Sequence, residues 1–300
     1  MARKHTNILP LSEDISVTEQ FGFLPKSVIR PLKNDKIGWE DAYLNDDIVE
    51  TRKTHGGYDK NGNVIVQKMS EFHAGLASNI IKYWSLPGSR VVDPFAGRVT
   101  RAVVATKLGR DYYGYEITPT TYKRSLEHFN KIGISPTLYN GDGTMMRDTS
   151  DCFADFVYTC PPYFNVEKYE SCEGQLSDIS NYDTFLSSME ICATNTFRVL
   201  KPGAFCAFVV ADFRVRGELK SFSTDLITKF KNCNMIHWDT VIVETLTPFI
   251  GMNAIQSSRK RYTTKIHEYV LVFKKPGEYV IPEYCSNIEP TNKITLNTFF

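Results

Sequence analysis

Three acidic residues of this sequence lie at the ends of predicted strands, where they could bind a ligand. Asp93, Glu116 and Asp142 each lie at or just after the end of a short apolar segment typical of a β-strand. In an open α/β sheet, ligands bind at the carboxyl ends of the strands, and an acid about 20 residues beyond the first loop commonly binds ribose hydroxyls. We expect Asp93 to hold an ammonium group, Glu116 to bind a ribose, and Asp142 to accept from an adenine amino group. Any one of these acids alone could equally cap a strand end.

The loop after the first predicted strand reads Asp93-Pro94-Phe95-Ala96-Gly97. It contains neither G-x-G-x-x-G nor G-x-x-x-x-G-K, so it is not built to cradle a pyrophosphate. Gly97 permits close approach of the backbone to a ligand. Acids at three successive strand ends, without a phosphate loop, favour S-adenosylmethionine over NAD or ATP. The expected cofactor contacts are Asp93, Phe95, Ala96, Gly97, Thr100, Glu116, Ile117 and Asp142.

A second candidate segment, Cys160-Pro161-Pro162-Tyr163, directly follows the apolar stretch 153–159. Proline fixes its own φ, so two in succession would aim the Pro161 carbonyl into a cleft. The aromatic residue Tyr163 follows the two prolines directly.

These two segments together resemble the DNA amino-methyltransferases, which methylate the exocyclic nitrogen of adenine or cytosine. That family has Asp, Asn or Ser followed by Pro-Pro-Tyr or Pro-Pro-Phe, paired with an Asp-Pro-Phe-x-Gly loop. The resemblance covers roughly residues 70–275. It implies that Cys160, Pro161, Pro162 and Tyr163 are the catalytic residues and that S-adenosyl-L-methionine is the methyl donor. It implies DNA as the substrate and direct transfer without a covalent enzyme intermediate. An exocyclic amine is a poor nucleophile because its lone pair is delocalised into the ring, so the resemblance implies that the Pro161 carbonyl and the Cys160 side chain accept its two hydrogens. It also implies that Tyr163 stacks on a base flipped out of the duplex.

The sequence departs from this family pattern at two positions. Cys160 replaces the usual Asp, Asn or Ser, and a thiol is a weaker acceptor. Covalent attack by Cys160 on cytosine is disfavoured, because the ring-carbon methyltransferases place Cys after Pro. Arg98 stands where the family has a small residue. Arg98 and Arg101 could contact the cofactor carboxylate or a phosphate, and they could equally form a solvated helix start.

Two further functions stay open at this point. Related Pro-Pro-Tyr loops act on amino groups in RNA, although the chain shows no recognisable RNA-binding module. A catalytically silent methyltransferase fold that binds nucleic acid beside a partner subunit is the second alternative, because of Cys160 and Arg98. A homodimer is also compatible with the sequence. The target base, adenine or cytosine, is not determined.

A basic segment lies between the last two predicted strands. It carries Arg259, Lys260, Arg261, Tyr262 and Lys265, with no acid among them. Such a segment can contact phosphates, while its aromatic side chain can contact bases. We expect it to bind nucleic acid, with a solvated surface loop as the alternative. A weaker second candidate is 212–216, which contains Arg214 and Arg216.

Strands and helices alternate along the part of the chain that carries these residues. We predict strands at 90–93, 111–116, 137–139, 153–159, 205–211, 238–244 and 267–274, and helices at 70–86, 102–108, 119–132, 182–200 and 221–233. Ser70 would cap the first helix. This alternation indicates an α/β fold with a mostly parallel sheet of seven strands, and the last two strands form an antiparallel edge hairpin. The resemblance implies the Rossmann-like fold of the S-adenosylmethionine-dependent methyltransferases.

The flanking regions are expected to be accessory. Residues 1–69 form an N-terminal extension with one hairpin across Tyr58 to Val66, residues 70–275 form the catalytic domain, and residues 276–300 form a tail. No apolar run approaches the about 20 residues that a membrane helix needs. Seven cysteines without C-x-x-C favour a reducing cytoplasm. His267-Glu268 lacks the second His of H-E-x-x-H, so we expect no metal. The net charge of +1 excludes a globally basic coat, although it permits a local basic cleft.

Overall fold

The computed structural model describes residues 25–31, 38–44, 51–58, 64–68, 72–164, 169–245, 258 and 260–286. Its centre is an eight-stranded sheet in the order β1-β11-β12-β8-β7-β4-β5-β6. The parallel part consists of β4 (Arg90–Asp93), β5 (Asp111–Glu116), β6 (Thr137–Asn140), β7 (Ala154–Thr159) and β8 (Leu200–Val210). β12 (His267–Lys274) runs antiparallel to both β8 and β11 (Ile236–Glu244).

The expected α/β class and the antiparallel hairpin are confirmed, but the count of seven strands is wrong. The eighth strand is β1 (Val28–Ile29), which pairs parallel to β11 at the outer edge. Two residues are too few to produce a period-2 pattern, so nothing in the local sequence indicates this strand. A segment of the N-terminal region therefore belongs to the central sheet.

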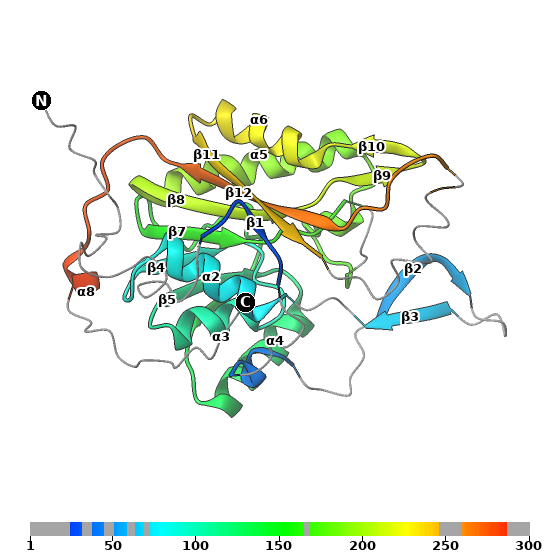
Figure 1. Ribbon diagram of the computed structural model, residues 1–300. Coiled ribbons are helices and arrows are strands. Elements are labelled where there is room, and N and C mark those ends of the chain that lie inside the picture. The colour runs from blue at the N-terminus through cyan, green and yellow to red at the C-terminus, as the bar shows by residue number, and fades with distance from the viewer. Residues whose placement is uncertain are drawn as a thin grey trace, which may run out of the picture.

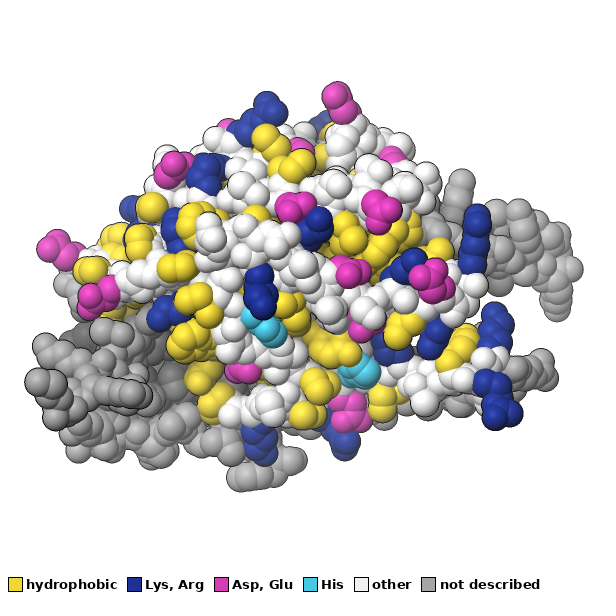
Figure 2. Space-filling model, turned by 90° about the horizontal axis from the view of Figure 1, so that it is seen from above, with side chains coloured by type: hydrophobic (Ala, Val, Ile, Leu, Met, Phe, Trp, Pro, Cys, Tyr) yellow, Lys and Arg dark blue, Asp and Glu magenta, His cyan; other side chains and the backbone are white. Residues whose placement is uncertain are grey.

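Helices cover both faces of the sheet (Figure 1). On one face, α2 (Ala74–Trp84), α3 (Thr100–Lys107) and α4 (Pro119–Ile132) pack into one apolar cluster with the sheet. On the other, α5 (Tyr182–Val199) and α6 (Phe222–Asn232) contribute to a second cluster. The sheet is thus apolar on both sides, as expected for parallel strands connected by helices. Acidic and basic side chains are interspersed over the face shown in Figure 2, in keeping with the small net charge.

Local sequence explains where the helices begin and end. α4 begins at Pro119 and ends at Ile132, and the Gly133 that follows has a φ of 72°, the left-handed conformation that glycine adopts at low cost. α2 begins at Ala74, because the His73 ring accepts from the Leu76 amide at 3.3 Å. The expectation that Ser70 caps this helix is therefore wrong: His73 has this role.

Several short elements complete the fold. The predicted hairpin of the N-terminal region is confirmed as β2 (Thr51–Tyr58) with β3 (Val64–Lys68), and its turn lies outside the described residues. A second hairpin, β9 (Phe213–Val215) with β10 (Glu218–Lys220), forms in a stretch where no strand was predicted. The remaining elements are η1 (Glu40–Ala42), η2 (Leu176–Asp178) and α8 (Glu283–Ser286).

The segment after β12 is held at the amino end of β7 by a buried carboxylate. Asp155 accepts hydrogen bonds from the hydroxyls of Tyr279 at 2.8 Å and Tyr284 at 2.7 Å. It also forms an ion pair with Lys201 at 2.6 Å. The guanidinium of Arg90 lies 4.6 Å from the centre of the Tyr284 ring. Residues beyond 275 thus satisfy a charge inside the sheet.

Within the described residues, no helix combines the length and the apolar character needed to cross a bilayer. All seven cysteines lie in the described part of the chain and none forms a disulfide; three of them are buried: Cys192, Cys206 and Cys285. In the described part of the chain, no three His, Cys, Asp or Glu side chains group as metal ligands would.

Candidate functional site

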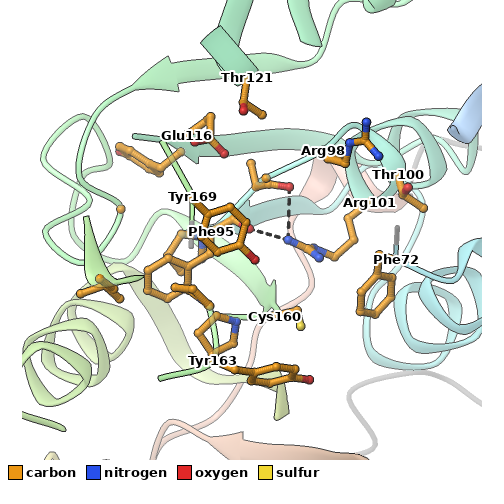
Figure 3. A pocket seen from close by; sticks show the side chains of 18 of the residues that line it. Phe72, Phe95, Arg98, Thr100, Arg101, Glu116, Thr121, Cys160, Tyr163 and Tyr169 are labelled. Carbon is orange, nitrogen blue, oxygen red and sulfur yellow. Dashed lines mark hydrogen bonds between the residues drawn. The ribbon is translucent and has the colours of Figure 1, made fainter. Parts of the chain in front are cut away.

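One cavity of about 630 Å³ opens at the carboxyl ends of β4, β5 and β7. The structure brings both candidate segments into its wall (Figure 3). All four expected catalytic residues line it, and so do seven of the eight expected cofactor contacts. These are Cys160, Pro161, Pro162 and Tyr163, with Phe95, Ala96, Gly97, Thr100, Glu116, Ile117 and Asp142.

Asp93, the eighth expected contact, lies behind the cavity wall. Its side chain is fully buried, and Oδ1 accepts from the Thr159 hydroxyl at 2.6 Å and from the Phe95 amide at 3.1 Å. Oδ2 accepts from Arg101 Nε at 2.7 Å and from the Tyr112 hydroxyl at 2.9 Å. Both oxygens of the carboxylate thus bind groups inside the protein. This position differs from the expectation that Asp93 faces the cavity and holds a ligand's ammonium group.

Arg101 explains this difference. It is 5% exposed and donates to the carbonyl oxygens of Phe95 and Ala96, as the dashed lines in Figure 3 show. Its guanidinium also lies 5.0 Å from the centre of the Phe72 ring. Burial alone would lower the pKa of Arg101, but Asp93 outweighs it and the net pKa is raised. Arg101 is therefore a buried cation whose hydrogen bonds hold the loop in place. The alternative prediction, that Arg101 is a solvated residue at the start of a helix, is excluded. Arg98 lines the cavity.

The other two acids face the cavity. Glu116 is 7% exposed, and its Oε1 accepts from the Thr118 amide at 2.7 Å. Asp142 is exposed, and its Oδ1 accepts from the amide and the hydroxyl of Thr144 at 2.8 and 2.7 Å. These bonds fix the direction of each carboxylate. Two anionic acceptors thus stand at neighbouring strand ends of one cavity.

The turn that carries Asp142 packs directly on the first loop. A Cβ placed on Gly143 would lie 1.7 Å from the Pro94 carbonyl oxygen, so only glycine fits there. Gly97 has a φ of 55°, in the region that favours glycine, and lines the cavity. Glycines therefore set the distance between the two loops on the cofactor side.

The Tyr163 side chain forms a hydrogen bond with a strand that is distant in sequence. Its hydroxyl donates to Glu268 Oε1, on β12, at 3.0 Å. Burial, together with Cys160 and Glu268 beside the hydroxyl, raises the pKa of Tyr163 well above its usual value. The phenol therefore stays protonated and continues to donate. Cys160 is half-buried and packs against the apolar cluster on the α2 side of the sheet.

Several residues outside the expected site complete the cavity. They come from elements far along the chain: Pro31, Phe72, His73, Leu76, Tyr169, Gln175, Val243, Thr245 and Glu268. Tyr169 is among the lining residues labelled in Figure 3. Gln175 Nε2 donates to the Thr118 hydroxyl at 3.4 Å, so this segment closes the side near β5. Of these, only His73 and Glu268 carried a signal, as ionisable residues at predicted element starts.

The two basic segments meet outside the cavity. The guanidinium of Arg214, on β9, lies 4.4 Å from the centre of the Tyr262 ring. Lys265 Nζ donates to the Asp212 carbonyl oxygen at 2.8 Å. Lys260 and Arg261 are exposed, and Arg259 lies outside the described residues. The hairpin β9–β10 and the segment before β12 therefore form one surface, although their sequences predicted two separate candidates.

Comparison with known proteins identifies the family to which this chain is similar. A family model described as "DNA methylase", of the N6/N4 methyltransferase type, matches residues 27–127 and 154–298. The chain is 27% identical over 131 residues to the orphan methyltransferase M.BamHII of Bacillus amyloliquefaciens. That match covers 44% of this chain and 42% of the relative, so less than half of the relative's length is spanned.

Solved structures share the architecture at low identity. The [4+2]-cyclase SpnF is 14% identical, with a TM-score of 0.50, over 68% of this chain and 82% of its own. A DNA modification methylase from Thermus thermophilus, solved with S-adenosyl-L-methionine, is 24% identical over 45% of this chain and 53% of its own, with a TM-score of 0.34. The first likeness shows a Rossmann-like fold alone, which different reactions use. The family match is of another kind, because it runs over most of the chain and over both loops of the cavity: the chain belongs to the N6/N4 DNA methylase family.

Proposed function

We propose that the chain transfers a methyl group from S-adenosyl-L-methionine to the exocyclic amino group of adenine or cytosine in DNA. The observation that carries this proposal is that the 93–97 loop and the 160–163 loop line one cavity. A donor site and an acceptor site in separate cavities could not exchange a methyl group. The family match supports the same reaction class.

The chemistry of the cavity wall fits the cofactor. Glu116 stands at the end of β5, where an acid commonly binds ribose hydroxyls. Asp142 presents an exposed carboxylate next to that position, suited to accept from an adenine amino group. Gly97 lets the backbone approach the ligand closely. S-adenosylmethionine, when bound, supplies a methyl group on a positively charged sulfur.

The remaining wall suits a flipped base. The Pro161 carbonyl and the Cys160 side chain are the acceptors we propose for the amine hydrogens, and Tyr163 is the stacking surface. The hydrogen bond from Tyr163 to Glu268 fixes the phenol ring before a base enters. Positioning of this kind contributes to the rate because the reacting groups are held in the geometry of attack.

We propose that the surface formed by β9, β10 and the segment before β12 contacts the DNA backbone. It combines Lys260, Arg261, Tyr262 and Lys265 with Arg214, and Arg259 is adjacent in sequence. Phosphate contacts there would orient the duplex while the base enters the cavity. We also propose a cytoplasmic location, from the use of cysteine, and residues 70–275 as the domain that contains both functional loops, with residues on either side completing the sheet and the cavity wall.

Nucleoside mass spectrometry tests the proposal directly. The full chain is incubated with S-adenosylmethionine carrying a labelled methyl group and with duplex DNA or RNA, and the nucleosides are separated after digestion. We expect label on the N6 of adenine or the N4 of cytosine, in DNA. Label on a ring carbon would refute the amino-group mechanism, and label on RNA alone would move the assignment to RNA.

A further inference from the structure

Glu268 lies in the cavity wall on the side of the catalytic segment. It is the second residue of β12, is half-buried, and lines the cavity together with Cys160 and Tyr163. Its Oε1 accepts from the Tyr163 hydroxyl at 3.0 Å, and Cys160 interacts with the same hydroxyl. One phenol hydroxyl therefore brings the thiol and the carboxylate close to each other.

The proposed reaction needs a strong hydrogen-bond acceptor for an amine hydrogen beside Cys160. A thiol sulfur accepts hydrogen bonds weakly. Cys160 also packs against an apolar cluster that includes Tyr158 and Ala77. Hydrogen bonds to an ionised acceptor are roughly twice as strong as those between neutral groups. Of the two side chains that meet at the Tyr163 hydroxyl, the carboxylate is the better partner for an amine hydrogen.

The surroundings of Glu268 keep it suited to this task. An ionised carboxylate offers about four acceptor positions, so a bond from Tyr163 does not exhaust it. The phenol of Tyr163 donates and adds no negative charge, because burial raises its pKa. Lys265, in the segment before β12, interacts electrostatically with Glu268.

We propose that Glu268 is a catalytic residue that accepts a hydrogen bond from the amino group of the target base and takes up the proton that this group releases. The inference rests on the proposed function. The amine lone pair forms the new N–CH₃ bond, and the S–CH₃ bond of the donor breaks with its electron pair left on sulfur. The nitrogen, now positively charged, loses one proton to the Glu268 carboxylate, which passes it to solvent. In this refinement of the proposed function, Glu268 replaces the Cys160 thiol as the acceptor of one amine hydrogen, and the Pro161 carbonyl holds the other.

The test uses the full chain, S-adenosylmethionine and plasmid DNA from a methylation-deficient host. Single-turnover methyl transfer is measured, together with S-adenosylmethionine affinity by calorimetry. Glu268→Gln keeps an acceptor for the Tyr163 hydroxyl and loses the charge, so we expect the rate to fall about 100-fold, within the range of acid–base catalysis, at unchanged affinity. Tyr163→Phe removes the hydroxyl and keeps the ring, so a smaller loss is expected. Asp239→Asn removes a charge from an exposed site on β11 and serves as the matched control, with the wild-type rate.

A rescue separates direct contact from mere positioning of Tyr163. In the double variant Cys160→Asp, Glu268→Gln, a carboxylate at the head of the catalytic segment replaces the lost acceptor. We expect it to regain at least about 10-fold in rate over Glu268→Gln, which is the non-additivity of residues that share one task. A Glu268→Gln rate no lower than that of Tyr163→Phe, or no rescue, would overturn the proposal. A wild-type chain that binds the cofactor and methylates no DNA would refute the proposed function instead, before any variant is made.

Discussion

The Thr159 hydroxyl donates to Asp93 Oδ1 at 2.6 Å and thereby joins the ends of β7 and β4. Thr159 is the last residue before the proposed catalytic segment 160–163, and Asp93 is the first residue of the proposed cofactor loop 93–97. Arg101 forms an ion pair with this carboxylate and also donates to the carbonyl oxygens of Phe95 and Ala96 in the same loop. The distance between the two functional loops is thus fixed by one buried charged cluster.

The first prediction concerns this cluster. Breaking a buried ion pair by removing one partner typically costs about 3–5 kcal/mol, because the other charge stays buried and uncompensated. We expect Arg101→Met to lower the free energy of unfolding by about this amount, since Asp93 would keep only neutral donors. Urea denaturation measures the change. The double variant Asp93→Asn, Arg101→Met removes both charges and should recover part of the loss; equal stability of both variants would show that the pair is not coupled.

The second prediction concerns the contact between the two cofactor loops. Gly143→Ala would place a Cβ 1.7 Å from the Pro94 carbonyl oxygen, so the loops must separate. Overpacking of this kind costs about 1–3 kcal/mol, and we expect S-adenosylmethionine affinity to fall about 10-fold or more. Calorimetry measures the affinity. Gly141→Ala, in the same turn, meets no protein atom within 4 Å and should keep the wild-type stability to urea, whereas Gly143→Ala should lose stability; equal losses of stability in both variants would contradict the packing argument.

The third prediction concerns alkaline pH. Burial raises the pKa of Tyr112, Tyr158 and Tyr163 well above the usual value near 10. Above that value, the folded chain keeps protons that the unfolded chain loses, so the free energy of unfolding falls as pH rises. Three such groups contribute up to about 4 kcal/mol per pH unit above about pH 10. Urea denaturation at several pH values measures the slope, which should be nearly flat in neutral solution with respect to these groups.

Tyr158 supplies the control for that slope. Within the described residues, its buried hydroxyl has no hydrogen-bond partner. Tyr158→Phe should therefore reduce the alkaline slope by up to about 1.4 kcal/mol per pH unit. It should also raise stability at neutral pH by about 1 kcal/mol, because an unsatisfied buried hydroxyl is removed. A loss of stability at neutral pH would indicate that the hydroxyl is solvated or bonded.

The fourth prediction concerns DNA binding at the surface formed by β9, β10 and the segment before β12. Each lysine that contacts a phosphate displaces about 0.9 counterion on binding B-DNA, which sets the slope of log affinity against log salt concentration. We expect Lys260→Ala to weaken binding and to reduce this slope by about 1. Fluorescence anisotropy over a salt series measures both. Lys131→Ala, exposed in the last turn of α4, is the matched control and should leave the slope unchanged.

Regular elements were well predicted where their residues repeat with a period. β4, β5, α4 and β12 have the predicted bounds, since buried strands and amphipathic helices carry that signal. β1, β9 and β10 have two or three residues each, too few for any period. Their pairing depends on neighbours far along the chain, which a local pattern does not encode.

The site was predictable to the extent that it consists of two contiguous loops. Asp93 was placed in the cofactor site because it ends a strand, yet a buried cation eight residues later holds it inside the wall. Glu268 and Phe72 reach the cavity from β12 and from the segment before α2. Only the folded sheet order brings these residues to Cys160, so spacing along the chain gave no indication of their role.

The Asp155 cluster and strand β1 have a practical consequence for experiments on fragments of this chain. A fragment cut to 70–275 would retain both functional loops. It would also lose Pro31 from the cavity wall, expose the edge of β11, and strip the carboxylate of Asp155 of its two tyrosine partners. The segments that flank 70–275 therefore stabilise the sheet and complete the cavity. We do not expect the isolated 70–275 fragment to keep the site intact.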